Sequence, residues 1–390
     1  MIKSLWSLLL LPILALSVGC PTTGDDDDSG AGDDDDAAVP VIVTSTSPAP
    51  DDNNFFFAAK PWARFDRAPD SATMMLHDAA GTMVASTDTV DGTLMTLDPG
   101  APLTPSAAYT LDIEWAPCDG CPVSISFMTG PYGNDLDDAE GTLVGATYNI
   151  DLAGANFVEP PGVGPILQSQ IGDIAILFSM LASSDFTPAA QPGLQIMGAL
   201  GAVVDPVNGL IEQEACTETL AFTAGVDGEI GTADDTPASW VNPDMELGPT
   251  NLDISVQGIT ATIQDLVITG TFHPDGDDMQ GGTFAGSVDT RPLAPELDPE
   301  GGEDAVCNLV EETIGIECEP CQDDGSEPFC LSVLATDIVA TKVDGLALVG
   351  MTCETIIDMF VADATVCADE AAAYDEDTNG VYELCGDYTP

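Results

Sequence analysis

Short runs with a two-residue period constrain the fold of this 390-residue chain more than any other feature. Between Tyr109 and Trp115, apolar side chains alternate with polar ones, as in a strand with one buried face. Similar short runs are Ile42–Thr46, Phe55–Ala58, Thr73–Leu76, Thr93–Leu97 and Ser124–Met128. Turns containing Pro, Asp and Gly separate these runs. Many short strands at this spacing predict an antiparallel β-sandwich over residues 41–130.

The same stretch resembles the bacterial Ig-like domains of S-layer-associated and other surface proteins. The resemblance is carried by Ser45–Pro50, Arg64–Asp66, Leu76–Gly81, Leu103–Leu111 and Phe127–Thr129. It implies a spacer or binding module and brings no catalytic residues. The last hairpin of the family often carries an Asp/Gly loop, and this chain has Cys118 and Cys121 there, which suggests a local disulfide.

Residues 131–390 form a second predicted domain, for which no family resemblance was found. Strand patterns cover Leu143–Leu152, Gln195–Val204, Asn251–Phe272 with a break at Gly258, Gly282–Val288 and Leu331–Val349, the last as two strands meeting near Asp344. Ile166–Leu181 indicates a buried helix or hairpin, and helices are expected at Ala305–Ile314 and Cys353–Cys367. The fold class is therefore mainly β, an Ig-like sandwich plus a larger disulfide-stapled β-rich domain with a few helices.

The chain has 11 cysteines. Setting aside Cys20 leaves an even set, which most simply forms disulfides in an oxidising compartment. The candidates are Cys118, Cys121, Cys216, Cys307, Cys318, Cys321, Cys330, Cys353, Cys367 and Cys385. Zinc binding by the two CxxC pairs is an alternative, but the pairs are far apart in the sequence. A redox pair at Cys118 and Cys121 is a second alternative, disfavoured because they lie in a loop between strands.

Residues 1–19 have the layout of a secretory signal peptide. Lys3 precedes the apolar run Leu5–Leu16, and small residues lead to Cys20. The run is too short for a transmembrane helix, which needs about 20 apolar residues. The segment resembles the bacterial lipoprotein signal, although Ser17 stands where leucine is usual. The resemblance implies a lipid on Cys20, and Pro21 after it favours sorting to the outer membrane.

Residues 20–40 are expected to form an acidic tether. Two tracts, Asp25–Asp28 and Asp33–Asp36, repel themselves and offer no apolar surface to bury. The whole chain has 6 Lys and Arg against 67 Asp and Glu, a net charge of −61. Such a chain repels phosphate backbones, so nucleic acid is excluded as a partner. It attracts divalent cations instead.

Two acidic loops are candidate calcium sites, with calcium as the one cofactor considered. The first loop has oxygen ligands at every second position, followed by a glycine for the turn, as in the first half of a calcium loop. Its candidate ligands are Asp375, Asp377, Asn379 and Glu383. The second loop offers Asp227, Asp234 and Asp235. Loops in which these side chains cap their own backbone are the alternative.

The sequence predicts a protein that is not an enzyme. Its two histidines, His77 and His273, have no nearby nucleophile motif. The favoured function is a non-catalytic, lipid-anchored envelope protein whose Ig-like module displays the β-rich domain for adhesion or envelope structure. Its expected partners are the membrane, through Cys20, and a surface protein or glycan, on the periplasmic or cell-surface side of the outer membrane. A carrier of an apolar ligand, and less favoured a carboxylate-dependent hydrolase, are the alternatives.

Overall fold

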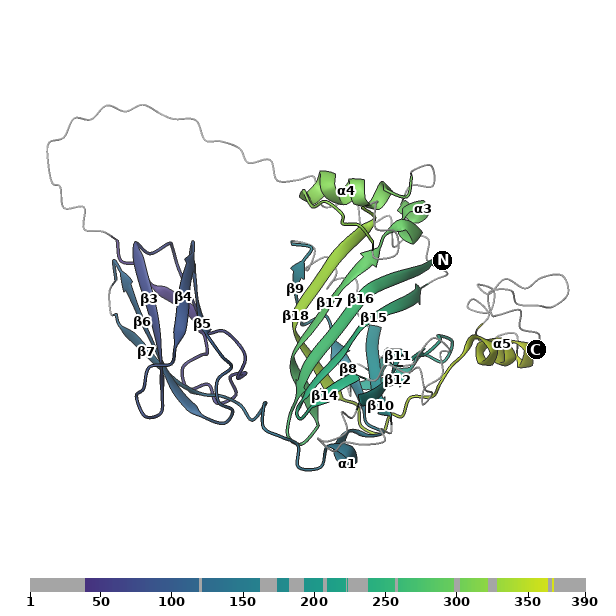
Figure 1. Ribbon diagram of the computed structural model, residues 1–390, viewed down its shortest axis with the longest axis horizontal. Helices are drawn as coiled ribbons and strands as arrows, with labels where there is room; N and C mark the ends of the chain where they lie inside the picture. The colour runs from purple at the N-terminus through teal and green to yellow at the C-terminus, as the bar shows by residue number, and fades with distance from the viewer. Residues whose placement is uncertain are drawn as a thin grey trace. The chain divides into compact units, whose positions relative to one another are not determined.

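Most of the chain after residue 38 is described by the computed structural model of the protein (Figure 1). The described residues are 39–118, 121–161, 174–181, 193–205, 209–221, 223, 238–256, 259–297, 302–321, 328–363 and 367. The chain divides into two units, Met1–Val39 and Pro40–Pro390. Of the helices in the described part, none combines the length and apolar character that crossing a membrane requires.

Residues 43–128 form two antiparallel sheets. The first has the order β1-β2-β5-β4 and the second the order β3-β6-β7. The bounds are β1 (Val43–Ser47), β2 (Trp62–Phe65), β3 (Ser71–Asp78), β4 (Ser86–Asp91), β5 (Leu94–Pro99), β6 (Ala108–Ala116) and β7 (Val123–Met128). With the strands lettered A to G, the sheets read A-B-E-D and C-F-G, the strand order of a constant-type immunoglobulin domain. The predicted Ig-like sandwich is confirmed as a fold.

The core of this sandwich comes from the alternation seen in the sequence. Phe65 and Leu97 of the first sheet pack in one cluster with Leu111 and Trp115 of the second. Tyr109 lies near the start of β6, and its hydroxyl accepts a hydrogen bond from the Thr104 N–H at 2.9 Å. A tyrosine at this position that bonds the preceding corner is a feature of such sandwiches.

The strand predictions in this half contain one error and two omissions. Phe55–Ala58 is not a strand, since Phe55 forms only an isolated parallel bridge with Thr129 before the chain turns. The strands β2 and β4 were not predicted. β4 is polar and largely exposed at the edge of its sheet, so it lacks the apolar alternation that marks a half-buried strand.

The second half forms a sheet that closes on itself. Each of β8, β10, β11, β14, β15, β16, β17 and β18 pairs with the next, and β18 pairs back with β8. The bounds are β8 (Thr147–Asp151), β9 (Asn156–Glu159), β10 (Ile174–Leu181), β11 (Gly193–Asp205), β12 (Leu210–Gln213), β13 (Leu220–Ala221), β14 (Ala238–Val241), β15 (Asp244–Val256), β16 (Ile259–Phe272), β17 (Asp278–Asp289) and β18 (Cys330–Lys342). The short strands β9, β12 and β13 add to its margins.

The predicted boundary at residue 130 falls between the strands of the sandwich and those of this closed sheet. Apolar side chains that share one face of the strands fill the space inside the closed sheet. Tyr148 stacks on Phe178 with ring centroids 5.2 Å apart, and Phe272 contacts both Tyr148 and Trp240. These rings belong to one buried cluster with side chains from other closing strands.

Helices lie at the ends of the closed sheet (Figure 1), with α3 and α4 at one end and α1 at the other. The bounds are α1 (Ala139–Leu143), the 3-10 helix η2 (Arg291–Leu293), α3 (Ala294–Leu297), α4 (Ala305–Ile314) and α5 (Cys353–Ala362). The helix predicted at Ala305–Ile314 is confirmed, and the one predicted from Cys353 is confirmed but shorter. Mainly β structure with few helices is thus the observed class.

Two predictions for this half need correction. Leu331–Val349 is not two strands: β18 is one long strand that ends at Lys342, before the predicted turn. The strand is long because β18 pairs along its length with β17 and, near its end, with β8 in the closed sheet. In the stretch expected to be a buried helix or hairpin, Ile174–Leu181 is a strand, so the helix alternative is wrong there. Residues 162–173 lie outside the described part, so the hairpin alternative stays a prediction.

Disulfides link several parts of the fold, as predicted. The bonded pairs are Cys118 with Cys121, Cys216 with Cys367, Cys307 with Cys318, and Cys321 with Cys330. Cys353 is also disulfide-bonded. Both CxxC pairs are engaged as disulfide partners, which leaves the zinc alternative without its thiolate ligands.

Candidate binding site on the sandwich

The outer face of the sheet β3-β6-β7 is polar because every second residue of these strands points away from the core. His77 lies opposite Thr110, which lies opposite Ser126. Two residues along β6, Asp112 lies opposite Ser124 of β7. Hydroxyl, carboxylate and imidazole groups therefore form rows across three adjacent strands.

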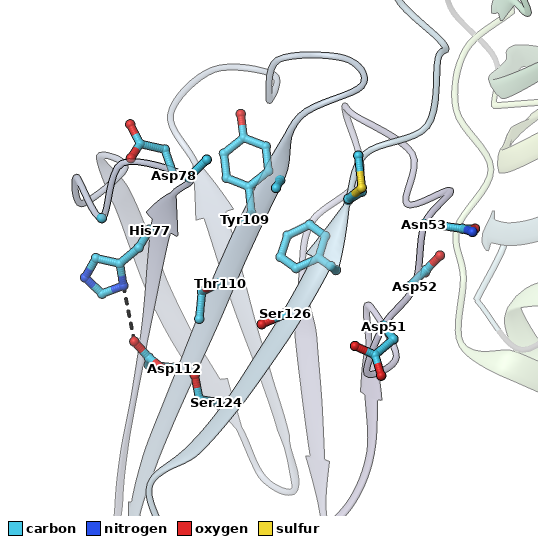
Figure 2. Close-up of a pocket in the computed structure, with 15 residues that line it drawn as sticks. Asp51, Asp52, Asn53, His77, Asp78, Tyr109, Thr110, Asp112, Ser124 and Ser126 are labelled. Atoms are coloured by element: carbon cyan, nitrogen blue, oxygen red, sulfur yellow. Dashed lines mark ion pairs between the residues drawn. The ribbon is translucent and has the colours of Figure 1, made fainter.

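A hollow of about 690 Å³ opens on this face (Figure 2). It is lined by strand residues and by two loops, the one before Phe55 and the turn after β3. The lining residues used below are Asp51, Asp52, His77, Asp78, Thr110, Asp112, Ser124 and Ser126. Met128 and Phe127 add apolar surface. The lining is thus mixed, with hydrogen-bond acceptors beside apolar patches.

His77 and Asp112 form the central ion pair of the hollow. Nδ1 of His77 lies 3.2 Å from Oδ2 of Asp112, and both side chains are more than a quarter exposed. Figure 2 shows Asp112 between His77 and Ser124, in agreement with the strand order. A nucleophilic serine would have to contact the other imidazole nitrogen, Nε2, which faces away from Ser124 and Ser126. The pair suits binding and positioning rather than nucleophilic catalysis.

Two carboxylates of the hollow also stabilise their own turns. Oδ1 of Asp78 accepts from the Ala80 N–H at 2.9 Å and from the Thr82 N–H at 2.8 Å. Oδ1 of Asp52 accepts from the Asn54 N–H at 2.9 Å. These bonds fix the positions of the rim, as Asx turns do. The rim carboxylates are therefore held in place by their own backbone.

Two basic residues of the sandwich, Lys60 and Arg67, are ion-paired with neighbouring aspartates. Nζ of Lys60 lies 2.8 Å from Asp98, and Nη2 of Arg67 lies 3.4 Å from Asp66. The Ile42 N–H, and the Arg67 charge beside it, lower the pKa of Asp66 against the opposing effect of desolvation. The hollow itself has no Lys or Arg among its lining residues.

Two buried tyrosines in the second half are neutral hydrogen-bond donors. Burial, and then the hydrogen bond to Asp278, raise the pKa of Tyr132, whose hydroxyl lies 2.6 Å from Oδ1 of Asp278. Burial and nearby aspartates raise the pKa of Tyr148, which donates to the Gly276 carbonyl at 2.7 Å. Neither hydroxyl is suited to act as a base.

The residues predicted to bind calcium or lipid lie outside the described part of the chain. This applies to Asp227, Asp234, Asp235, Asp375, Asp377, Asn379, Glu383 and Cys20, and also to Cys385. Calcium binding therefore stays a prediction. Within the described ranges, His, Cys, Asp and Glu side chains do not gather in threes in a way that could hold a metal ion.

No single stretch of the sequence marks the hollow. The polar positions Thr110 and Asp112 were visible in the alternation of β6, but their pairing with Ser124 and Ser126 depends on register. His77 lacks a nearby nucleophile motif in the sequence, and its ion pair with Asp112 is seen only in the structure. A polar outer face in three strands is the signal that could have found the site.

Comparisons with known proteins do not connect the chain to a family. No protein-family model and no curated protein matches it. Among solved structures, it is similar to an uncharacterized protein from Listeria monocytogenes EGD-e, with 9% identity and a TM-score of 0.17. That match covers 82% of this chain, and the chain spans 31% of the length of the Listeria protein. At this TM-score the likeness supports no conclusion about fold or function.

Proposed function

We propose that this protein is a non-catalytic, lipid-anchored protein of the outer membrane that displays a closed β-sheet on an Ig-like sandwich. The proposal combines the signal and tether of the first forty residues with the two β-structures that follow. Its role is adhesion or envelope structure, at the periplasmic or external side of the membrane.

One observation favours the display role over the alternative of a carrier for an apolar ligand. A closed sheet of eight strands has an interior that side chains just fill, or that holds one small ligand. Here Tyr148 and Phe272 are fully buried, Phe178 is 3% exposed, and Tyr148 contacts both other rings. The space that an apolar ligand would need is occupied by the protein's own side chains in this part, which counts against a carrier.

The hollow on β3-β6-β7 supplies a contact surface for a partner. Its carboxylates and hydroxyls accept hydrogen bonds, and no Lys or Arg lines it. A surface protein that presents basic side chains, or a glycan hydroxyl, is complementary to these groups. A second copy of this chain is a poor partner, because only 6 of its residues are Lys or Arg.

Replacing the lipid-bearing residue tests the proposal. The parent chain is expected in the outer-membrane fraction with an acylated N-terminal cysteine by mass spectrometry, because several acyl chains give stable anchoring. Cys20→Ser is expected to move the protein to the soluble fraction. Protease added to intact cells then distinguishes the external side from the periplasmic side.

The double variant Cys118→Ser/Cys121→Ser is the matched control, since it also replaces cysteines but leaves Cys20 unchanged. It is expected to stay in the membrane fraction. A parent protein with an unmodified Cys20, or a Cys20→Ser variant that still fractionates with the outer membrane, would contradict the anchor.

A further inference from the structure

The first residues of the sandwich, Pro40–Ile42, are hydrogen-bonded to it through several of their backbone groups; we call them the attachment segment. The Val41 N–H donates to the Pro117 carbonyl at 2.8 Å, and Nε1–H of Trp115 donates to the Val41 carbonyl at 2.8 Å. The Val41 side chain is 2% exposed in the sandwich core. The end of β6 and the residue after it thus bind both backbone groups of Val41.

A second set of bonds comes from the residues that follow β2. The Ile42 N–H donates to Oδ1 of Asp66 at 3.0 Å, and the Asp66 N–H donates to the Ile42 carbonyl at 3.0 Å. Nη2 of Arg67 donates to the Pro40 carbonyl at 2.7 Å. Three successive carbonyls of the attachment segment are therefore bonded, by donors from two parts of the sandwich.

The chain leaves the sandwich through residues that are bonded in a similar way. The Gly130 N–H donates to the Phe55 carbonyl at 2.9 Å. The hydroxyl of Thr129, which is 2% exposed, donates to the Thr104 carbonyl at 2.7 Å. Both points where the chain joins the sandwich are thus fixed.

These two points lie at opposite ends of β7. The attachment segment forms a parallel bridge from Val41 to Cys118, between the end of β6 and the start of β7, whereas Thr129 directly follows β7. The strand has 6 residues, which corresponds to about 20 Å at ~3.3 Å per residue. A pull that arrives at Val41 and leaves at Gly130 therefore runs along the strands. Antiparallel hydrogen bonds are perpendicular to that direction, so they are loaded together rather than one after another.

We infer that the sandwich is a mechanical link, which carries tension from the attachment segment to Gly130 while staying folded. The Cys118–Cys121 disulfide closes the loop next to Pro117, the bonding partner of Val41, so this loop cannot extend under load. Tension between a membrane and a bound partner arises only in an anchored protein, so this role rests on the proposed function. The resistance to force is a property of the folded sandwich itself.

Single-molecule pulling of the full mature chain, held at its two ends, tests the inference. Rupture of residues 41–130 is identified by an extension of about 30 nm, at ~3.5 Å per residue. Asp66→Ala removes the acceptor of the Ile42 N–H, and Asp66 is exposed, so the variant is expected to fold. We expect its rupture rate at fixed force to rise about tenfold, the effect of losing one charged hydrogen bond.

Asp88→Ala is the matched control. Oδ2 of Asp88 accepts from the Met74 N–H at 3.2 Å, in the same sandwich but between β3 and β4. We expect the rupture rate of this variant to stay within about twofold of the parent, because the bond that it removes does not join the attachment segment to the sandwich. Equal rupture rates for the two variants, measured with their melting temperatures, would overturn the inference. Different rates in a protein whose Cys20 proves unmodified would support the link while refuting the anchor.

Discussion

The sandwich and the closed sheet are both antiparallel, but they are closed by different kinds of contact. The strands of the sandwich pair with neighbours inside a stretch of fewer than about a hundred residues, and its disulfide joins cysteines with a sequence separation of 3. In the second half, β18 pairs back with β8, and Cys216 bonds Cys367 at a sequence separation of 151. Local patterns therefore specify the sandwich, whereas long-range contacts complete the closed sheet.

The difference has an energetic consequence. A cross-link lowers the conformational entropy of the unfolded chain by an amount that grows with the loop it closes. In the second half the cross-link joins the turn after β12 to the segment after α5, so the loop that it closes is long. The sandwich obtains most of its stability from strands with alternating apolar residues that pair with strands nearby in the sequence.

The largest expected effect is the removal of the long-range disulfide. Cys216→Ala/Cys367→Ala should lower the free energy of unfolding by about 5 kcal/mol, from loop entropy alone. Cys118→Ala/Cys121→Ala should lower it by only about 1.5 kcal/mol. Denaturant unfolding followed by tryptophan fluorescence measures both. Similar decreases in the free energy of unfolding for the two double variants would contradict this difference between the two halves.

A smaller effect is expected from opening the interior of the closed sheet. Phe272 is fully buried against Tyr148 and Trp240, so Phe272→Ala should cost about 3–5 kcal/mol and leave a cavity. The variant should then bind an apolar dye that the parent does not bind. Val241→Ala is the control, because Val241 is 69% exposed and its truncation should change stability by less than about 0.5 kcal/mol. Strong dye binding by the parent would favour the carrier after all.

The smallest effect is a local response of the sandwich to acid. The Ile42 N–H and the Arg67 charge keep the pKa of Asp66 below its ordinary value of 3.8, so the folded state favours the carboxylate. A group with a lowered folded pKa stabilises the fold above its unfolded pKa, and this contribution is lost as pH falls through the folded pKa. The protection of the Ile42 amide against hydrogen exchange, measured relative to its intrinsic exchange rate at each pH, should therefore fall below about pH 3.8. In Asp66→Ala this protection should be low at every pH, and a parent amide whose protection does not change with acid would exclude the bond.

Some elements could be predicted from the sequence because their signal is local. Tyr109–Trp115 alternates strictly and forms most of the central strand β6, and Ala305–Ile314 has one apolar face and is the helix α4. β4 could not be predicted in this way, because a polar edge strand has no buried face to mark it. The pairing of Cys216 with Cys367 could not be predicted either, since ten cysteines allow many connectivities.

The candidate site follows the same division. The residue types of the hollow are visible in the alternation of β3, β6 and β7, but their meeting depends on how the strands are aligned. A shift of β3 by one residue against β6 would turn His77 toward the core and away from Asp112. The attachment segment is a still clearer case, because Pro40–Ile42 carries no pattern that indicates bonding to Trp115 or Asp66.

By itself, the sequence determined that the protein is mainly β, rich in disulfides and strongly acidic, because these properties depend on residue types and short periods. Only the tertiary structure decided that the second half closes on itself through β8 and β18, and that His77 faces Asp112. The physical reason is that closure and register depend on the summed fit of many weak contacts between distant residues, which no single stretch of the chain encodes.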